Sequence, residues 1–402
     1  AHAAAHGFTL PPIRLVRVHS SGTGLTGGGT AGSDGIVAVG ADRAGATLAT
    51  QRGEGVVILG GTPGALLKLA QKLPLGAGGD APLPAPALVV DEASMMVFPV
   101  FLALATLVRE DGEVLLAGDH RQLAPIVGHD WEHEERPPVQ LYQPYVSAYV
   151  AIDQLKGGQR LGDEQITRSA LRYTFRLPAP VRDLLDRLYR LDGIQLEGRP
   201  AEATEKRTGA ATGPDPWERL WQGEGGLFLV THAERGSKGS NPVEAAILQE
   251  ILAAGARSGK LSPGSVGIVT PHRAQRSLLR GALSDYSEAV DVLDTVERLQ
   301  GGERETILVS ATCSDPAAIQ ARAEFLLSLN RANVAFSRAK QRLVVVCAET
   351  LLAHIPPELE HYQAALLWKS LRALCSQPLA EVQIEGHQVG LLTLPLAEAP
   401  AP

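Results

Sequence analysis

Short apolar runs that end in small or acidic residues recur between residues 55 and 349 and limit the folds open to this chain. Their length and β-branched residues are typical of strands buried on both faces of a parallel sheet. Stretches with helical spacing, such as NPVEAAILQEILAAGARSG at 241–259, lie between them. This alternation predicts right-handed βαβ units and an α/β fold with parallel sheets. The runs are GVVILGGT (55–62), PALVVDEAS (86–94), GEVLLAGD (112–119), GGLFLVTH (225–232), GSVGIVTP (264–271), ETILVSAT (305–312) and RLVVVCAE (342–349).

The strands fall into two groups, because the segment 128–165 between them is irregular. We therefore expect two sheet domains, at 1–165 and 166–385, and a C-terminal tail at 386–402. Surface loops are expected at 20–35, which is rich in glycine, and at 197–217. Ligands of such sheets bind beyond the carboxyl ends of the strands, so the polar residues that end the runs are candidate site residues.

Composition argues against several classes of protein. The net charge of −7 over 402 residues does not suit a uniformly basic nucleic-acid-coating protein, although a motor needs basic residues only along one groove. No run reaches the ~18–20 apolar residues of a membrane-spanning helix. The three cysteines have no disulfide or metal-binding spacing, so we expect buried free thiols and a reducing cytosol.

Two acidic residues follow the strand at 86–90. Asp91 is a candidate Mg²⁺ ligand, and Glu92 is a candidate base that polarises the water attacking a γ-phosphate. Helix capping is the alternative role for this pair. In GDHRQLAP (118–125), Gln122 is a candidate sensor of the γ-phosphate, and Asp119 could connect this sensor to the nucleic-acid-binding face. The alternative is an ordinary Gly-Asp turn.

Two arginines are candidate fingers for phosphoryl transfer: Arg176 in YTFRLP and Arg338 in NVAFSRAK. A guanidinium fork stabilises charge on equatorial phosphate oxygens better than a lysine does. Gly302 and Glu303, in TVERLQGGERE with Gln300, supply a tight turn and a polar pair for a nucleotide cleft. Surface salt bridges and a solvated Gly-Gly hairpin are the alternatives.

The order of these segments resembles the superfamily 1B helicases of the nonsense-mediated-decay and senataxin type, including bacterial relatives. In that family DEAS would be motif II, GDHRQLAP motif III, YTFRLP motif IV, TVERLQGGERE motif V and NVAFSRAK motif VI. GGTPGALLK (60–68), SNPVEAAIL (240–248) and VGIVTPHRAQ (266–275) also match, so the resemblance covers roughly residues 55–350. It implies two RecA-like domains that bind ATP and Mg²⁺ between them and step along single-stranded DNA or RNA, typically 5′ to 3′.

One family motif is absent. The P-loop pattern GxxxxGK[ST], whose lysine contacts the β- and γ-phosphates, occurs nowhere in the sequence. The opening residues AHAAAHG resemble the end of motif Ia, which follows the P-loop in the family. We therefore expect a first domain truncated at its N-terminus, and we do not expect this chain to hydrolyse ATP alone.

Contacts to nucleic acid are less specific in the sequence. Thr62, Thr270, Arg273 and Thr295 end strands or begin helices, where hydroxyls and guanidinium groups can hold a phosphate backbone without reading sequence. His272 stands where relatives often carry tyrosine and could stack on a base. For each residue an ordinary loop role is the alternative.

The sequence therefore predicts an ATP-dependent nucleic-acid helicase or translocase. The alternative is a nucleotide-independent nucleic-acid-binding or assembly subunit that keeps the helicase fold. A third possibility is that a separate chain or segment supplies the P-loop. The sequence holds no nuclease constellation that would support a nuclease activity.

Overall fold

The computed structural model describes residues 12–19, 36–41, 55–72, 84–125, 145–157, 166–198, 215–223, 225–298, 302–357 and 359–395. The chain divides into two compact units. Unit 1 comprises Ala1–His120 and Ala124–Ile166, and unit 2 comprises Arg121–Leu123 and Thr167–Pro402. The tripeptide Arg121–Leu123 thus belongs to unit 2, although the chain on either side of it belongs to unit 1.

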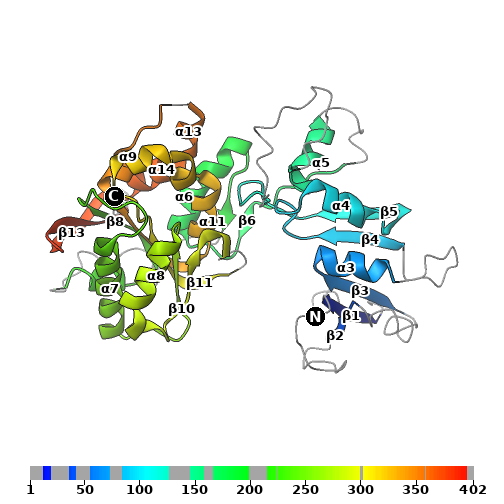
Figure 1. Ribbon diagram of the computed structural model, residues 1–402, viewed down its shortest axis with the longest axis horizontal. Coiled ribbons are helices and arrows are strands. Elements are labelled where there is room, and N and C mark those ends of the chain that lie inside the picture. The colour runs from blue at the N-terminus through cyan, green and yellow to red at the C-terminus, as the bar shows by residue number, and fades with distance from the viewer. Residues whose placement is uncertain are drawn as a thin grey trace, which may run out of the picture. The chain divides into compact units, whose positions relative to one another are not determined.

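Unit 1 holds two small parallel sheets (Figure 1). In one, β1 (Ile13–His19) lies between β2 (Ile36–Gly40) and β3 (Val56–Gly61), and α3 (Pro63–Ala70) packs against it. In the other, β4 (Ala85–Val90) pairs with β5 (Val108–Leu116) beside α4 (Phe98–Ala105) and α5 (Ala148–Gly157). The helix α5 lies inside the segment that we expected to be irregular.

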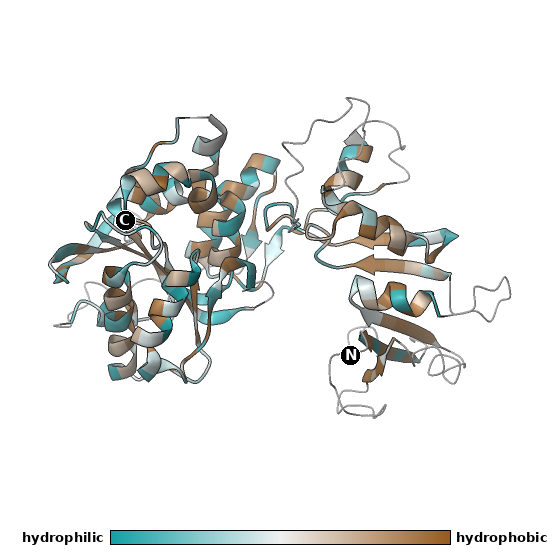
Figure 2. Cartoon of the chain, in the orientation of Figure 1, coloured by the Kyte–Doolittle hydropathy of each residue, from teal (hydrophilic) through white to brown (hydrophobic). Residues whose placement is uncertain are grey.

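The strands of unit 1 are hydrophobic but not fully buried. Figure 2 colours much of β3 and β4 as hydrophobic, yet Val89 is 65% exposed and Leu115 is 61% exposed. The prediction of strands buried on both faces is therefore wrong for unit 1. The reason is that no element among the described residues covers the second face of β4 and β5.

Unit 2 is built on a seven-stranded sheet in the order β10-β9-β11-β12-β8-β14-β13. The first five strands in this order are parallel, and β14 and β13 add to β8 as an antiparallel hairpin. The strands are β8 (Gly226–His232), β9 (Val266–Thr270), β10 (Val290–Thr295), β11 (Arg304–Ser310), β12 (Ala339–Ala348), β13 (Gln377–Ile384) and β14 (His387–Thr393). A separate short pair joins β6 (Tyr173–Thr174) to β7 (Glu197–Gly198).

Helices cover both faces of the large sheet, as the continuously apolar strands predict. In β12, Leu343 and Val345 contribute to the core on one face, and Val344 and Val346 to the core on the other. The first core includes α6 (Ala179–Tyr189), α10 (Ala323–Leu327), α11 (Leu329–Phe336) and α14 (Leu366–Leu374), and the second includes α7 (Pro242–Arg257) and α8 (Arg273–Ala282). The remaining elements are α9 (Pro316–Ala321), α12 (Glu349–Ala353), α13 (Leu359–Ala364) and the short 3₁₀ turns η1 (Arg190–Asp192), η2 (Glu218–Leu220), η3 (Ser284–Tyr286) and η4 (Val296–Arg298).

The end of the sheet departs from the prediction of a tail at 386–402. Residues 387–393 form β14, which pairs with β8 in the sheet. Glu385 and Gly386 turn the hairpin with φ of 50° and 76°, as a two-residue turn between twisted strands requires. The alternating residues of β13 and β14 are therefore part of the fold.

Two predicted loops are only partly described. Residues 20–35 lie outside the described residues, as do residues 199–214 of the loop expected at 197–217. At the end of that second loop, Trp217 is 6% exposed and packs in the core beneath α7. Among the helices that the structure describes, none is long and apolar enough to cross a membrane.

Candidate functional site

In unit 1 the acidic pair lies where two strands end side by side. The Ala117 N–H donates to the Val90 carbonyl and the Ala93 N–H donates to the Ala117 carbonyl, both at 2.8 Å. Gly118 fits this approach because a Cβ there would lie 2.9 Å from the Ser94 nitrogen. The strand ends therefore bring the DEAS and GDHR segments together.

The backbone of the acidic pair is strained. Glu92 has a φ of 52°, in the left-handed region that side chains other than glycine rarely adopt. The exposed Asp91 carboxylate accepts a hydrogen bond of 2.9 Å from the Glu92 N–H through Oδ1. Backbone strain of this kind costs about 1–3 kcal/mol and is common at functional sites. Both carboxylates lie at the carboxyl edge of the β4–β5 pair, as predicted from the sequence.

In unit 2, Arg338 and Gln122 are in direct contact. Arg338 follows α11 and is 3% exposed. Its Nη2 donates to Gln122 Oε1 at 3.2 Å, and its Nε donates to the Val334 carbonyl at 3.2 Å. The structure thus joins a predicted γ-phosphate sensor to a predicted arginine finger, although they are separated by more than 200 residues.

A second cluster forms around Glu303, which directly precedes β11. Its Oε2 lies 2.7 Å from Arg176 Nε, and its Oε1 lies 2.5 Å from Lys340 Nζ. The hydrogen bond from Lys340, with the charge of Arg176, holds the pKa of Glu303 below its ordinary value. All three side chains are a third or more exposed, so a ligand can compete for them. Gly302 is half-buried beside Glu303, and Gln300 lies outside the described residues.

These two clusters share one edge of the sheet. The Arg304 N–H donates to the Arg338 carbonyl at 3.1 Å, and Arg304 stands opposite Ala339 where β11 and β12 begin. Glu303 and Arg338 therefore lie at the amino ends of these strands. The expected site at the carboxyl ends concerned the residues that end the apolar runs, whereas Glu303 and Arg338 occupy the segments that enter β11 and β12.

The predicted nucleic-acid residues of unit 2 lie at the opposite edge, where β9 and β10 end. Thr295 stands opposite Thr270 in the last register of this pair. Arg273 is exposed in the first turn of α8, and Thr295 is half-buried with its side chain bonded to Glu297. The Thr270 side chain is fully buried and its hydroxyl lies 2.9 Å from that of Thr312. Thr270 therefore faces inward, contrary to the prediction that it contacts a phosphate backbone.

His272 is only half-exposed at this edge. Its ring lies 5.8 Å from the Phe325 ring, with an angle of 32° between the planes, and its Nε2 is buried without a hydrogen-bond partner in the described part of the chain. Burial, helped by the charge of Arg322, lowers the pKa of His272. In unit 1 the corresponding prediction, Thr62, is exposed at the start of α3.

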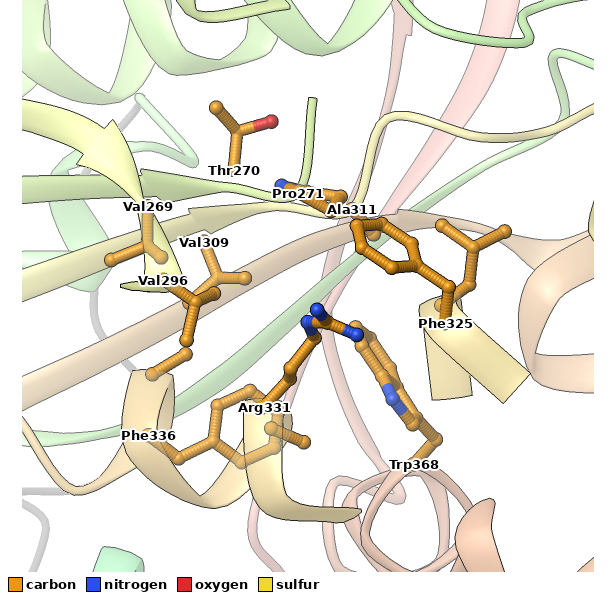
Figure 3. A pocket seen from close by; sticks show the side chains of 13 residues that line it. Val269, Thr270, Pro271, Val296, Val309, Ala311, Phe325, Arg331, Phe336 and Trp368 are labelled. Atoms are coloured by element: carbon orange, nitrogen blue, oxygen red, sulfur yellow. The ribbon is translucent and has the colours of Figure 1, made fainter. Parts of the chain in front are cut away.

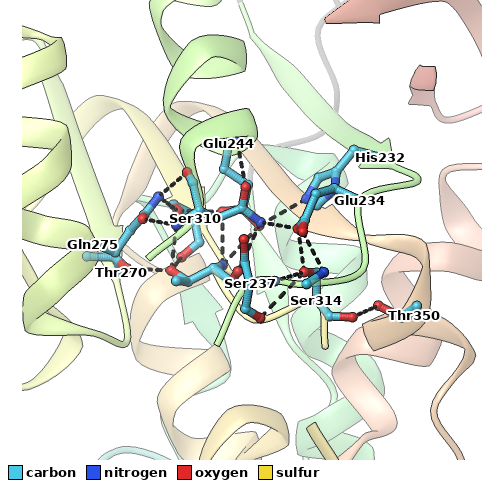
Figure 4. A network of polar contacts seen from close by, with 12 residues as sticks. His232, Glu234, Ser237, Glu244, Thr270, Gln275, Ser310, Ser314 and Thr350 are labelled. Atoms are coloured by element: carbon cyan, nitrogen blue, oxygen red, sulfur yellow. Dashed lines mark hydrogen bonds and ion pairs between the residues drawn. The ribbon is translucent and has the colours of Figure 1, made fainter. Parts of the chain in front are cut away.

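A buried polar network beneath this edge was not predicted (Figure 4). Glu244 of α7 is fully buried and accepts from the Thr312 N–H at 2.9 Å and the Ser310 hydroxyl at 2.5 Å. Gln275 of α8 donates to the same hydroxyl at 3.0 Å and accepts from the Asn241 N–H at 2.6 Å. The polar residues of SNPVEAAIL and PHRAQ, which match the family, were the available signal. The network fixes the starts of α7 and α8 on the strand ends.

A small apolar pocket lies where β9 and β11 meet α10, α11 and α14. Figure 3 shows the Arg331 guanidinium pointing into it, and this group lies 4.1 Å from the centre of the Phe325 ring. The cavity holds about 30 Å³, which is room for roughly one water molecule. The pocket is therefore too small for a nucleotide.

The metal prediction rests on Asp91. Among the described residues, no group of three or more His, Cys, Asp or Glu side chains could hold a metal ion. An exposed carboxylate with a second oxygen outside its backbone hydrogen bond is nevertheless the ligand type that suits Mg²⁺ when phosphate oxygens and water complete the shell.

Comparisons with known proteins match this chain to helicases over the region that contains these motifs. The AAA domain family matches residues 227–350. The DNA replication ATP-dependent helicase/nuclease JHS1 of Arabidopsis thaliana is 26% identical over 277 residues, which cover 67% of this chain and 19% of that protein. The Regulator of nonsense transcripts 1 homolog of Neurospora crassa is 23% identical over 314 residues, which cover 75% of this chain and 26% of that protein. The putative helicase MOV-10 of Gallus gallus is 33% identical over 123 residues, which cover 27% of this chain and 13% of that protein. The chain therefore spans about a quarter or less of the length of these relatives.

Proposed function

Because the chain belongs to the superfamily 1B helicases, we propose that it is part of an ATP-dependent helicase or translocase that moves along single-stranded DNA or RNA, 5′ to 3′. The observation that carries this proposal is the pair of clusters at the amino ends of β11 and β12. A buried arginine bonded to a glutamine amide, beside an arginine–glutamate–lysine cluster, suits recognition of a nucleoside triphosphate.

The functional groups of these unit 2 residues are of the kinds that bind a nucleoside triphosphate. Arg338 and Arg176 would stabilise negative charge on the phosphates, and Gln122 would orient the γ-phosphate or the attacking water. Glu303 and Gly302 would line the nucleotide, and Glu303 would restrain Arg176. When bound, MgATP supplies the hydrolysable phosphoanhydride and the metal that neutralises its oxygens.

In unit 1, the proposed roles fall to the acidic pair. Asp91 would hold Mg²⁺, and Glu92 would accept the proton of the attacking water. The left-handed backbone at Glu92 supports this assignment, since strain at an acidic residue is common at functional sites. A P-loop lysine would come from a segment or separate chain outside these 402 residues.

The opposite edge would contact the nucleic acid. Arg273, Thr295 and, in unit 1, Thr62 would hold phosphates, and His272 would reach a base only if its ring leaves Phe325. The three buried free cysteines suit a reducing compartment such as the cytoplasm.

The test is the steady-state ATPase rate of the chain with and without single-stranded DNA or RNA. It is measured alone and with a P-loop-bearing segment supplied upstream, beside the near-isosteric variant Glu92→Gln. We expect strand-stimulated turnover only with the P-loop, and a loss of about 100-fold or more in Glu92→Gln.

Two results would contradict the proposal. Turnover that Glu92→Gln leaves unchanged would remove the assigned base. Strand binding without any nucleotide binding, even with a P-loop supplied, would favour the alternative of a nucleotide-independent binding or assembly subunit.

A further inference from the structure

The tripeptide Arg121–Leu123 is anchored in unit 2 at both of its ends. Leu123 is 7% exposed and packs in the core that contains Leu184 and Leu188 of α6. A buried leucine of this kind is a strong hydrophobic anchor. The anchor fixes the chain immediately after Gln122.

The chain immediately before Gln122 is held by an ion pair. Arg121 donates from Nε to Asp192 Oδ2 at 2.8 Å and from Nη2 to Asp192 Oδ1 at 2.6 Å. The two side chains are 23% and 17% exposed, so the pair is partly withdrawn from water. A bidentate arginine–carboxylate pair also fixes orientation, which a single surface contact does not.

The peptide carbonyl of Arg121 is held as well. Asn333 of α11 is fully buried, and its Nδ2 donates to the Arg121 carbonyl at 2.8 Å and to the Tyr189 hydroxyl at 3.0 Å. Both donor hydrogens of the Asn333 amide are therefore used, one by the Arg121 carbonyl and one by Tyr189 at the end of α6. Asn333 lies five residues before Arg338 in the same motif VI segment.

We propose that Asp192 and Asn333 are positioning residues that hold Arg121–Leu123 on unit 2, so that the Gln122 amide stays beside the Arg338 guanidinium. The γ-phosphate sensor and the arginine finger then act as one rigid element of unit 2. This inference rests on the proposed function. In this proposal Asp192 and Asn333 act through the placement of Gln122, because their hydrogen bonds described above are to Arg121 and Tyr189.

The first experiment measures how firmly residues 121–124 are held, in the absence of nucleotide. Backbone amide exchange at residues 121–124 is compared between the unchanged protein and Asp192→Asn, which keeps the size of the side chain and removes its charge. We expect roughly tenfold faster exchange, as for the loss of one charge-assisted hydrogen bond. The matched control is Asp183→Asn on α6, whose carboxylate is 61% exposed in an ion pair with Arg182.

The second experiment reads the consequence for nucleotide recognition, in the form of the protein that hydrolyses ATP. The ratio of affinities for a non-hydrolysable ATP analogue and ADP should fall about tenfold in Asp192→Asn and in Asn333→Leu. If Asp192 acts through Arg121, the double variant Arg121→Gln, Asp192→Asn should match Arg121→Gln alone.

The outcomes separate this inference from the proposed function. Unchanged amide exchange in Asp192→Asn overturns the inference, even if Asn333→Leu fails to fold. Faster exchange with an unchanged affinity ratio also overturns it, because the anchor is then structural only. If no form of the protein binds the ATP analogue, the proposed function fails, whereas faster exchange in Asp192→Asn still shows that Asp192 holds Arg121–Leu123 on unit 2.

Discussion

Replacement of Glu244 by alanine should destabilise unit 2 more than any exposed substitution on the same helix. The Glu244 carboxylate is fully buried, and both of its oxygens accept from the Thr312 N–H at 2.9 Å. The Ser310 hydroxyl donates to it at 2.5 Å, and His232 Nε2 lies 3.2 Å away. Alanine would leave these groups buried without their acceptor.

The expected cost follows from those contacts. Each buried donor that loses its partner costs about 1–3 kcal/mol, and Thr312 and Ser310 are two such donors. Breaking one side of a buried polar cluster of this kind costs about 3–5 kcal/mol, and we expect Glu244→Ala to fall in that range. Glu244→Gln keeps the volume and one acceptor oxygen, and should cost about 1–2 kcal/mol.

Urea unfolding followed by tryptophan fluorescence measures this cost. Of the four tryptophans, Trp217, Trp221 and Trp368 belong to unit 2, so a Trp131→Phe background makes the signal specific to that unit. The control is Glu250→Ala, an exposed position on α7. A loss of less than about 1 kcal/mol in Glu244→Ala, no larger than in the control, would refute the reasoning from buried hydrogen bonds.

Further predictions follow from the surroundings of individual side chains and glycines. Because burial lowers the pKa of His272 below 6.5, the unfolded chain binds this proton more tightly than the folded one. Stability should therefore be lost as the pH falls below 6.5, and urea midpoints of His272→Gln should fall less over the same range. The three cysteines are buried, and burial raises the pKa of Cys347, so a thiol reagent should modify none of them in the folded chain and all three after unfolding. A Cβ at Gly255 would lie 2.7 Å from Trp221 ring atoms, so Gly255→Ala should lower stability by about 1–3 kcal/mol. Gly281→Ala, which meets nothing within 4 Å, should raise stability slightly in the same unfolding assay.

The sequence predicted the central strands of unit 2 because both of their faces are buried, which makes their apolar runs continuous. It did not predict β10, an edge strand interrupted by aspartates. Asp291 pairs with Arg304 and Asp294 pairs with Arg276, each at 2.7 Å, so this strand carries two acidic side chains, whereas its neighbour β9 carries no charged residue. An edge strand tolerates charged residues because one of its sides is exposed. A search for continuous apolar runs therefore misses such a strand.

The candidate site could be predicted as a set of residues but not as an arrangement. The motifs identified Gln122 and Arg338, whereas their contact depends on the anchoring of Arg121–Leu123 in unit 2. The burial of Thr270 depends on Thr312, which lies 42 residues away and holds a left-handed φ of 72°. Contacts of this kind come from tertiary packing, and one sequence without its fold does not specify them.

The measurement that tests the central claim most directly is the equilibrium affinity for a non-hydrolysable ATP analogue and for ADP in Arg338→Ala. The exposed arginine variant Arg280→Ala on α8 is the control. If Arg338 and Gln122 read the γ-phosphate, Arg338→Ala should weaken the ATP analogue about 10–100-fold and change ADP binding little. Equal weakening of both nucleotides, or no change in either, would contradict the assignment of this edge of unit 2 as the γ-phosphate face.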